Sequence, residues 1–134
     1  MPGTIEFVED GRGLVFSGSG VLTGQEILEA KEALAADEVP LRTVKFALVL
    51  LEDVTAVDVT IGDLRAAAIV DRRLAQMMPN AAVAIVAPRD HDFGIARMWE
   101  AIADVPEWTT YVFRSREEAD AWLRALAVQS EPAP

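Results

Sequence analysis

The sequence predicts a single α/β domain in which an N-terminal hairpin leads into alternating strands and helices. Two short runs, residues 44–51 and 81–88, are almost unbroken in their hydrophobicity, as in strands buried on both faces of a parallel sheet. Stretches with apolar side chains at helical spacing follow both runs. Strands that alternate with helices in this way form mainly parallel sheets, which defines the predicted fold class.

The first elements are predicted to form an antiparallel hairpin. Residues 4–8 alternate polar and apolar side chains, and residues 14–19 place Leu14 and Phe16 on one face. Between them, Glu-Asp-Gly-Arg-Gly is a turn signal, because its two glycines adopt positive φ without a steric cost.

A capping box begins the first helix. The Thr23 hydroxyl and the Glu26 carboxylate can each accept a hydrogen bond from a backbone amide that the helix leaves free. This helix is expected to end near Ala36. The strand at residues 44–51 follows, and residues 54–59 are expected to form an irregular loop.

Thr60 is the predicted N-cap of the second helix, and Asp63 adds a charge that favours the positive end of the helix dipole. The helix is expected to run to about Met78, because Pro79 cannot continue it. The side chains expected to point inward are those of Leu64, Ala67, Val70, Leu74 and Met77.

The central unit consists of the strand at residues 81–88, the charged loop Arg-Asp-His-Asp, and a helix that begins near Phe93. Open α/β sheets bind ligands at such loops, which follow the carboxyl ends of strands. The inward side chains expected for this helix are Ile95, Met98, Trp99 and Ile102.

The last strand is predicted at residues 108–113, and a second capping box at Ser115 and Glu118 begins a final helix. Residues 128–134 are expected to form a flexible tail, so the domain is predicted over residues 1–127. The final helix is expected to bury Ala119, Trp122, Leu123 and Leu126.

Composition excludes several functions. The net charge of −10, from 22 acidic and 12 basic residues, disfavours contact with nucleic acid. No apolar run reaches the roughly 18 residues that a membrane span needs, so we expect no membrane insertion. With no cysteine, the chain has neither disulfides nor thiolate metal sites. No signal sequence is visible at the N-terminus, and we expect a cytoplasmic protein.

Residues 47–60, Ala-Leu-Val-Leu-Leu-Glu-Asp-Val-Thr-Ala-Val-Asp-Val-Thr, resemble the strand and switch loop of the SpoIIAA-like (STAS) family of anti-sigma-factor antagonists. In the regulatory branch of that family this loop carries Asp-Ser-Ser-Gly, with a phosphorylated serine at the helix start. Asp58 matches the aspartate, Val59 replaces the first serine, and Thr60 stands at the phosphoacceptor position. Ile61 then separates Thr60 from the glycine, a departure from the motif.

Two further passages are more similar to the uncharacterised stand-alone branch of the family. They are Ala-Pro-Arg-Asp at residues 87–90 and Glu-Glu-Ala-Asp-Ala-Trp-Leu at residues 117–123. The resemblance implies a SpoIIAA-like fold of order β-β-α-β-α-β-α-β-α, with an N-terminal hairpin and a mainly parallel sheet. It also implies a regulatory function exerted through contacts with another protein.

The predicted site lies at the carboxyl edge of the sheet, where three loops and three helix N-termini are expected to meet. Arg89 is expected either to bind an anion or to pair with Asp53 or Asp90. The candidate binding and switch residues are Asp53, Asp58, Thr60, Arg89, Asp90, His91 and Arg114.

An enzyme is the least favoured interpretation. His91, the only histidine, lies between Asp90 and Asp92, where a carboxylate would orient it as a general base or join it as a metal ligand. An alternative is a Mg²⁺ site formed by Asp53 and Asp58 together with Asp90 or Asp92. However, the sequence holds no nucleophile motif, P-loop or dinucleotide fingerprint. We therefore predict no catalytic residue, no metal and no cofactor.

The leading prediction is a non-enzymatic regulatory or binding domain with a protein partner. The alternative is a carrier that holds a small apolar or lipid-like ligand beneath a helix, which requires an apolar cavity. Core packing is the favoured role for the large side chains, although exposure of Met98, Trp99 or Trp108 would favour a homodimer or lipid capture. The other large side chains at issue are Met77, Met78 and Trp122.

Overall fold

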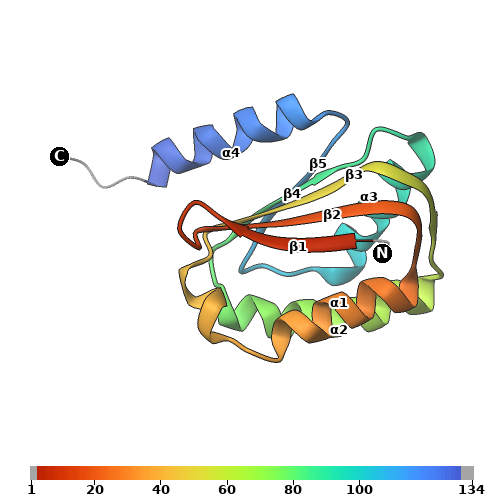
Figure 1. Ribbon diagram of the computed structural model, residues 1–134, viewed down its shortest axis with the longest axis horizontal. Coiled ribbons are helices and arrows are strands. Elements are labelled where there is room, and N and C mark those ends of the chain that lie inside the picture. Colours follow the sequence, from red (N-terminus) through yellow and green to blue (C-terminus); the bar gives the residue numbers. More distant parts are fainter. Residues whose placement is uncertain (1–2, 131–134) are drawn as a thin grey trace.

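The computed structural model describes residues 3–130, which form a five-stranded sheet with helices on both faces (Figure 1). The strands are β1 (Gly3–Val8), β2 (Gly13–Thr23), β3 (Phe46–Asp58), β4 (Ala82–Val86) and β5 (Thr109–Phe113). The helices are α1 (Gly24–Ala35), α2 (Ile61–Met77), α3 (Asp90–Ala103) and α4 (Arg116–Ser130), with a short 3₁₀ helix η1 (Val39–Thr43) before β3.

The strands lie in the sheet in the order in which they occur in the chain, β1-β2-β3-β4-β5. The pairing of β1 with β2 is antiparallel, and every other pairing is parallel. The predicted hairpin, fold class and element order are therefore confirmed. Within residues 3–130, no helix is both long enough and apolar enough to cross a membrane.

One prediction for the sheet is wrong. Residues 54–58 do not form a loop; they continue β3, which pairs with β2 as far as Thr23 and Asp58. The extension is stable because Val54 and Val57 are buried on the face that carries the main core. Register shifts near Gly20, whose φ is 62°, let the two strands bend together, and glycine adopts this φ without strain.

The hairpin turn also differs in detail from the prediction. Gly11 has positive φ as expected, but Gly13 is part of β2 and lies against the ring of Phe46. Glu9 and Asp10 supply the other positive φ values of the turn, at 53° and 57°.

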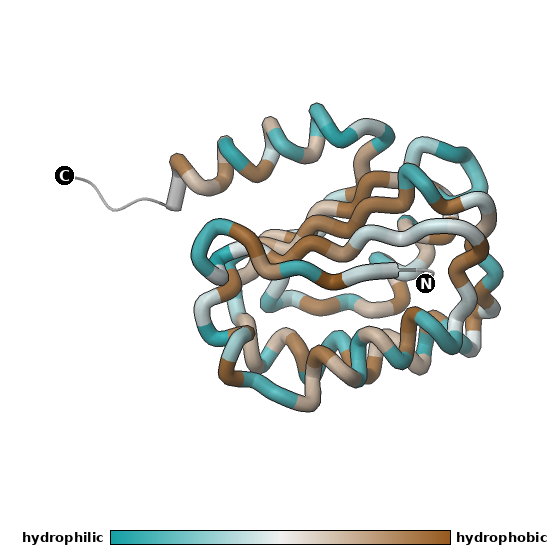
Figure 2. Tube along the Cα trace, viewed as in Figure 1, coloured by the Kyte–Doolittle hydropathy of each residue, from teal (hydrophilic) through white to brown (hydrophobic). Residues whose placement is uncertain are grey.

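The main core lies between the sheet and the layer formed by α1, α2 and α3. Paired residues of neighbouring parallel strands share a face, so the register assembles continuous apolar rows. Figure 2 shows these hydrophobic strands beside helices in which hydrophilic and hydrophobic residues alternate along the chain. Two rows facing this layer are Leu14, Ala47 and Val83, and Phe16, Val49 and Ile85.

Helix α4 covers the opposite face. Ala119 is fully buried there against Leu48, Ala84 and Val86. The ring of Trp122 packs 5.4 Å from that of Phe113 between centroids. Helix α4 continues to Ser130, three residues beyond the predicted end of the domain at residue 127, and residues 131–134 of the predicted tail lie outside the described part of the chain.

Helices α1 and α2 follow the predicted boundaries, whereas α3 begins earlier and is rotated about its axis relative to the prediction. It begins at Asp90, before the expected Phe93, and it buries Asp92, Ala96, Trp99 and Ala103. Met98, expected to point inward, is 41% exposed. The small side chains of the buried stripe allow α3 to lie close to its neighbours, which places the larger Met98 outside. Trp99 and Trp108 are buried, so neither offers an exposed face.

A buried charge links the three helices of the main layer. Asp71 of α2 is 1% exposed, and its carboxylate accepts hydrogen bonds from Lys31 Nζ at 2.6 Å and from Trp99 Nε1 at 2.7 Å. The Lys31 ammonium also lies 4.9 Å from the centre of the Trp99 ring. Because each donor comes from a different helix, Asp71 fixes α1 and α3 relative to α2.

Candidate functional site

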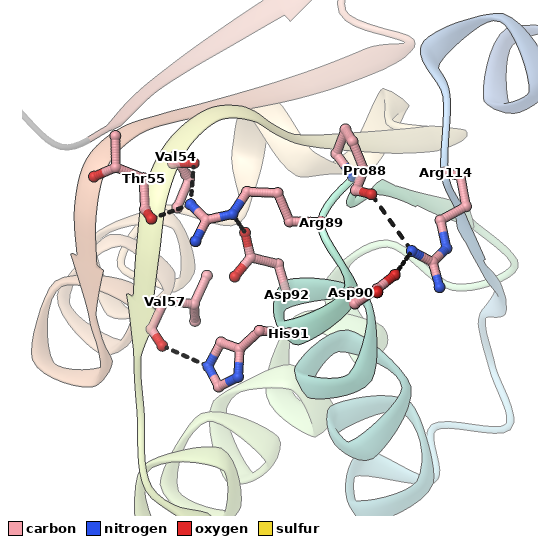
Figure 3. Close-up of polar contacts among 9 residues, drawn as sticks. All are labelled: Val54, Thr55, Val57, Pro88, Arg89, Asp90, His91, Asp92 and Arg114. Carbon is pink, nitrogen blue, oxygen red and sulfur yellow. Dashed lines mark hydrogen bonds and ion pairs between the residues drawn. The ribbon is translucent and has the colours of Figure 1, made fainter.

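The carboxyl edge of the sheet brings together the end of β3, the start of α3 and the start of α4 (Figure 3). Arg89, the N-cap of α3, reaches across to β3. Its Nη1 donates hydrogen bonds to the carbonyl oxygens of Thr55 and Val54, the latter at 3.0 Å. Arg89 therefore anchors the β4–α3 loop to the extended end of β3, and the predicted alternative of a pair with Asp53 or Asp90 is wrong.

Arg114 anchors the same loop from the other side. It forms an ion pair with Asp90 and donates to the carbonyl oxygen of Pro88 at 3.4 Å. Its guanidinium also lies 4.1 Å from the centre of the Phe93 ring. The Asp90 side chain is 95% exposed, so the ion pair contributes at most about 1 kcal/mol, and both charged groups stay accessible to a partner.

His91 lies beside these residues, and its imidazole contacts the backbone of β3. Its Nε2 is 3.3 Å from the carbonyl oxygen of Val57. Asp90 is paired with Arg114, and Asp92 lies next to Arg89, so no carboxylate among the described residues orients the imidazole. The carboxylate–histidine pair that the sequence offered as an alternative is therefore not formed among the described residues.

Thr60 occupies the start of α2 as predicted. Its hydroxyl accepts a hydrogen bond from the backbone N–H of Asp63 at 3.0 Å, and the Asp63 carboxylate accepts one from the N–H of Thr60 at 2.9 Å. Thr60 remains exposed. Ile61, the next residue, is half exposed at 51%, and Val21, which pairs with Ala56 from the neighbouring strand β2, is half exposed at 53%.

The cap is testable by substitution at Thr60. Replacing it with alanine is expected to lower the free energy of unfolding by about 1 kcal/mol, because the N–H of Asp63 loses its acceptor. Serine keeps the hydroxyl and serves as the matched control, with a loss of at most a few tenths of a kcal/mol expected. Urea unfolding measures both, and equal losses for the two variants would contradict the cap.

The other predicted site residues are not joined to this group. Asp53 and Asp58 are exposed on β3, opposite Ser19 and Thr23 of β2. Within residues 3–130, no three histidine or acidic side chains gather as a metal site would require. The edge thus unites Arg89, Asp90, His91 and Arg114, while Asp53, Asp58 and Thr60 lie along the end of β3 and the start of α2.

The structure gives a different place to Asp92, which the sequence analysis considered as a partner of His91 or as a ligand of Mg²⁺. Asp92 is fully buried, and its polar partner among the described residues is Arg89, whose Nε lies 3.8 Å from the carboxylate. Its spacing from Ala96 and Trp99, four and seven residues on, is the helical signal that could have placed it inward.

Asp92 lines a cavity of about 180 Å³ between the sheet and α1, α2 and α3. The wall is mostly apolar and includes Phe16, Leu22, Ile27 and Val49. The apolar cavity that the carrier alternative requires therefore exists. Asp63, Asp71 and Lys31 also contribute to its wall.

No protein-family model and no curated protein matches the chain. Among solved structures, the anti-sigma factor antagonist SpoIIAA in its unphosphorylated form is similar, with a TM-score of 0.59 and 12% identity. That match covers 92% of this chain and 97% of SpoIIAA.

Two further solved structures agree. The Bacillus cell fate determinant SpoIIAA in its phosphorylated form has a TM-score of 0.55 and 14% identity, over 91% of this chain and 99% of that one. An uncharacterised DUF3478-family protein from Shewanella loihica PV-4 with a SpoIIAA-like fold has a TM-score of 0.52 and 20% identity. The latter match covers 90% of this chain and 91% of that one. The chain therefore has the SpoIIAA-like (STAS) fold.

Proposed function

We propose that this chain is a non-catalytic regulatory domain of the STAS type, which acts by binding a protein partner at the start of α2. The observation that carries the proposal is the exposure of Asp58, Thr60 and Ile61 at the end of β3 and the start of α2, and of Val21 on the adjoining strand β2, which together are here called the Thr60 patch. It combines two half-exposed apolar side chains with an exposed hydroxyl and carboxylate. Apolar groups with polar groups at their margin are typical of surfaces that contact other proteins.

The fold supports this choice of surface. SpoIIAA, a structural neighbour of this chain, is an anti-sigma factor antagonist whose structure is known with and without phosphorylation. In the sequence resemblance, Thr60 stands at the phosphoacceptor position of that family. A phosphate there would be attracted by the free amides of the α2 N-terminus and repelled by Asp58 and Asp63.

The charge of the chain indicates the kind of partner. The net charge is −10, and Asp58 contributes an exposed negative charge to the patch. A partner with a basic margin around an apolar centre would match both features, because complementary charge speeds association and excludes wrong partners.

The absence of a supported base at the carboxyl edge favours binding over catalysis. Among the described residues, His91 contacts a backbone carbonyl and has no carboxylate partner. The adjacent ion pair of Arg114 with Asp90 and the anchoring of Arg89 hold the loop in place. We infer that this edge supports the neighbouring patch by fixing the end of β3.

The test is capture of partners from the host with single variants of the patch. Ile61→Asp is expected to abolish capture of any partner that the unmodified chain retains, because it places a charge in the apolar part of the interface. Aspartate in the first turn of a helix is favourable, so the fold should persist. Val128→Asp is the matched control, since Val128 is 70% exposed at the far end of α4. Loss of the same partner with both variants, or with neither, would contradict the proposed interface.

A further inference from the structure

The buried carboxylate of Asp92 is incompletely paired within the described residues. It is 0% exposed, and among residues 3–130 neither of its oxygens has a hydrogen-bond donor. The nearest cation is the guanidinium of Arg89, whose Nε is 3.8 Å away and whose Nη1 is engaged by two carbonyl oxygens of β3. A polar group buried without a hydrogen bond costs free energy, so its retention in an apolar wall points to a ligand.

The other polar groups of the cavity wall are already satisfied. Lys31 and Asp71 bind one another at 2.6 Å, and Asp71 also accepts the indole N–H of Trp99. The carboxylate of Asp63 accepts the backbone N–H of Thr60. Among the described residues of this wall, Asp92 is therefore the polar side chain that is left to bind a ligand in the cavity.

The size of the cavity limits the ligand. An apolar cavity of about 150 Å³ admits a molecule the size of benzene, and this cavity measures about 180 Å³. A hydrocarbon part of about six to eight carbons is therefore the largest that fits without movement of the wall. Ile5 of the edge strand β1 lines the cavity and is 38% exposed, which places an opening beneath that strand.

We propose that this cavity binds a small apolar amine, with its ammonium group on the carboxylate of Asp92 and its hydrocarbon part among the apolar side chains. An ammonium group supplies three donors and the opposite charge, which matches two carboxylate oxygens that lack donors. A neutral alcohol offers one donor and no charge, and a carboxylate ligand would be repelled. The net charge of −10 also raises the local concentration of cations around the chain. The proposal does not depend on a protein partner at the Thr60 patch.

Hexylamine is the probe, since its ammonium group, like that of lysine, is charged at neutral pH. Titration is followed by the indole N–H signals of the three tryptophans in ¹⁵N-labelled protein. Trp99 and Trp108 line the cavity, whereas Trp122 lies on the opposite face of the sheet and serves as an internal control. Saturable shifts of the first two signals, with the third unchanged, are expected. No saturable shift of Trp99 or Trp108 at millimolar hexylamine would overturn the cavity as a ligand site.

Head-group recognition is tested with ligands of the same length on the unmodified protein. Hexylamine is expected to bind about tenfold more tightly than 1-hexanol, and hexanoate more weakly still. Affinities of hexanol equal to or above that of hexylamine would overturn the assignment of an amine. This comparison requires no variant, so it remains decisive if substitutions at Asp92 disturb folding.

The variant test pairs neighbouring aspartates of one helix turn. Asp92→Asn is expected to lower the affinity for hexylamine by about tenfold or more. It should change the affinity for hexanol by less than about threefold. Asp90→Asn is the matched control, because the Asp90 side chain is 95% exposed, and no change beyond about twofold is expected. Unchanged hexylamine affinity in folded Asp92→Asn protein, confirmed by urea unfolding, would overturn the role of Asp92.

Discussion

Replacing Lys31 with methionine is expected to lower the free energy of unfolding by about 3–5 kcal/mol. The substitution leaves Asp71, which is 1% exposed, buried without the cation that binds it at 2.6 Å. The indole N–H of Trp99 stays as a donor but does not neutralise the charge. Methionine fills much of the volume of the lysine stem, so no large cavity forms. The loss in the free energy of unfolding therefore measures the cost of leaving the Asp71 carboxylate buried without its cation. Urea unfolding at neutral pH measures it.

Two controls isolate the buried pair. The double variant Lys31→Met with Asp71→Leu removes both charges, and most of the lost stability should return because an apolar pair replaces an ionic one. Arg42→Met breaks the exposed pair of Arg42 with Glu38, 3.6 Å apart, and should cost at most about 0.5 kcal/mol. A loss below about 1 kcal/mol for Lys31→Met alone would mean that water reaches Asp71.

Replacing Trp99 with alanine is expected to lower the free energy of unfolding by about 3–5 kcal/mol. The indole is buried between α3 and the core, and its Nε1 donates to the second oxygen of Asp71 at 2.7 Å. Alanine removes both the apolar surface and the hydrogen bond. Trp99→Phe keeps most of the ring and should cost about 1–3 kcal/mol, which separates the hydrogen bond from the packing.

The neighbouring methionine provides the matched control for Trp99. Met98 is 41% exposed on the same helix, so Met98→Ala should cost less than about 1 kcal/mol. Equal losses at the two positions, measured by urea unfolding, would contradict the observed rotation of α3.

The sequence by itself determined the features that depend on neighbours along the chain. The unbroken apolar run before Pro88 predicted a buried strand, because only a strand covered on both faces tolerates it. The capping box at Thr23 and the N-cap at Thr60 were confirmed because their hydrogen bonds join residues only three positions apart in the chain. At Ser115 the hydroxyl caps the N–H of Glu118 as predicted. These local signals together defined the SpoIIAA-like element order.

The carboxyl edge was predictable in its location but not in its contacts. The ends of parallel strands meet at one edge, so the meeting of Arg89, Asp90, His91 and Arg114 follows from topology. The partner of Arg89 did not follow, since the carbonyl groups it binds belong to the part of β3 that was expected to be a loop.

The features that depend on contacts between residues distant in the sequence were determined only by the tertiary structure. Residues 54–58 are a strand because β2 extends beside them, and the preference of their β-branched residues for strands depends on such a neighbour. The rotation of α3 was set by its packing against other elements, which turned Asp92 inward and Met98 outward. The cavity beside Asp92 is the space that side chains of the sheet and three helices leave unfilled. Such a space depends on the shapes of surfaces that meet only after folding, and for that reason periodicity could not reveal it.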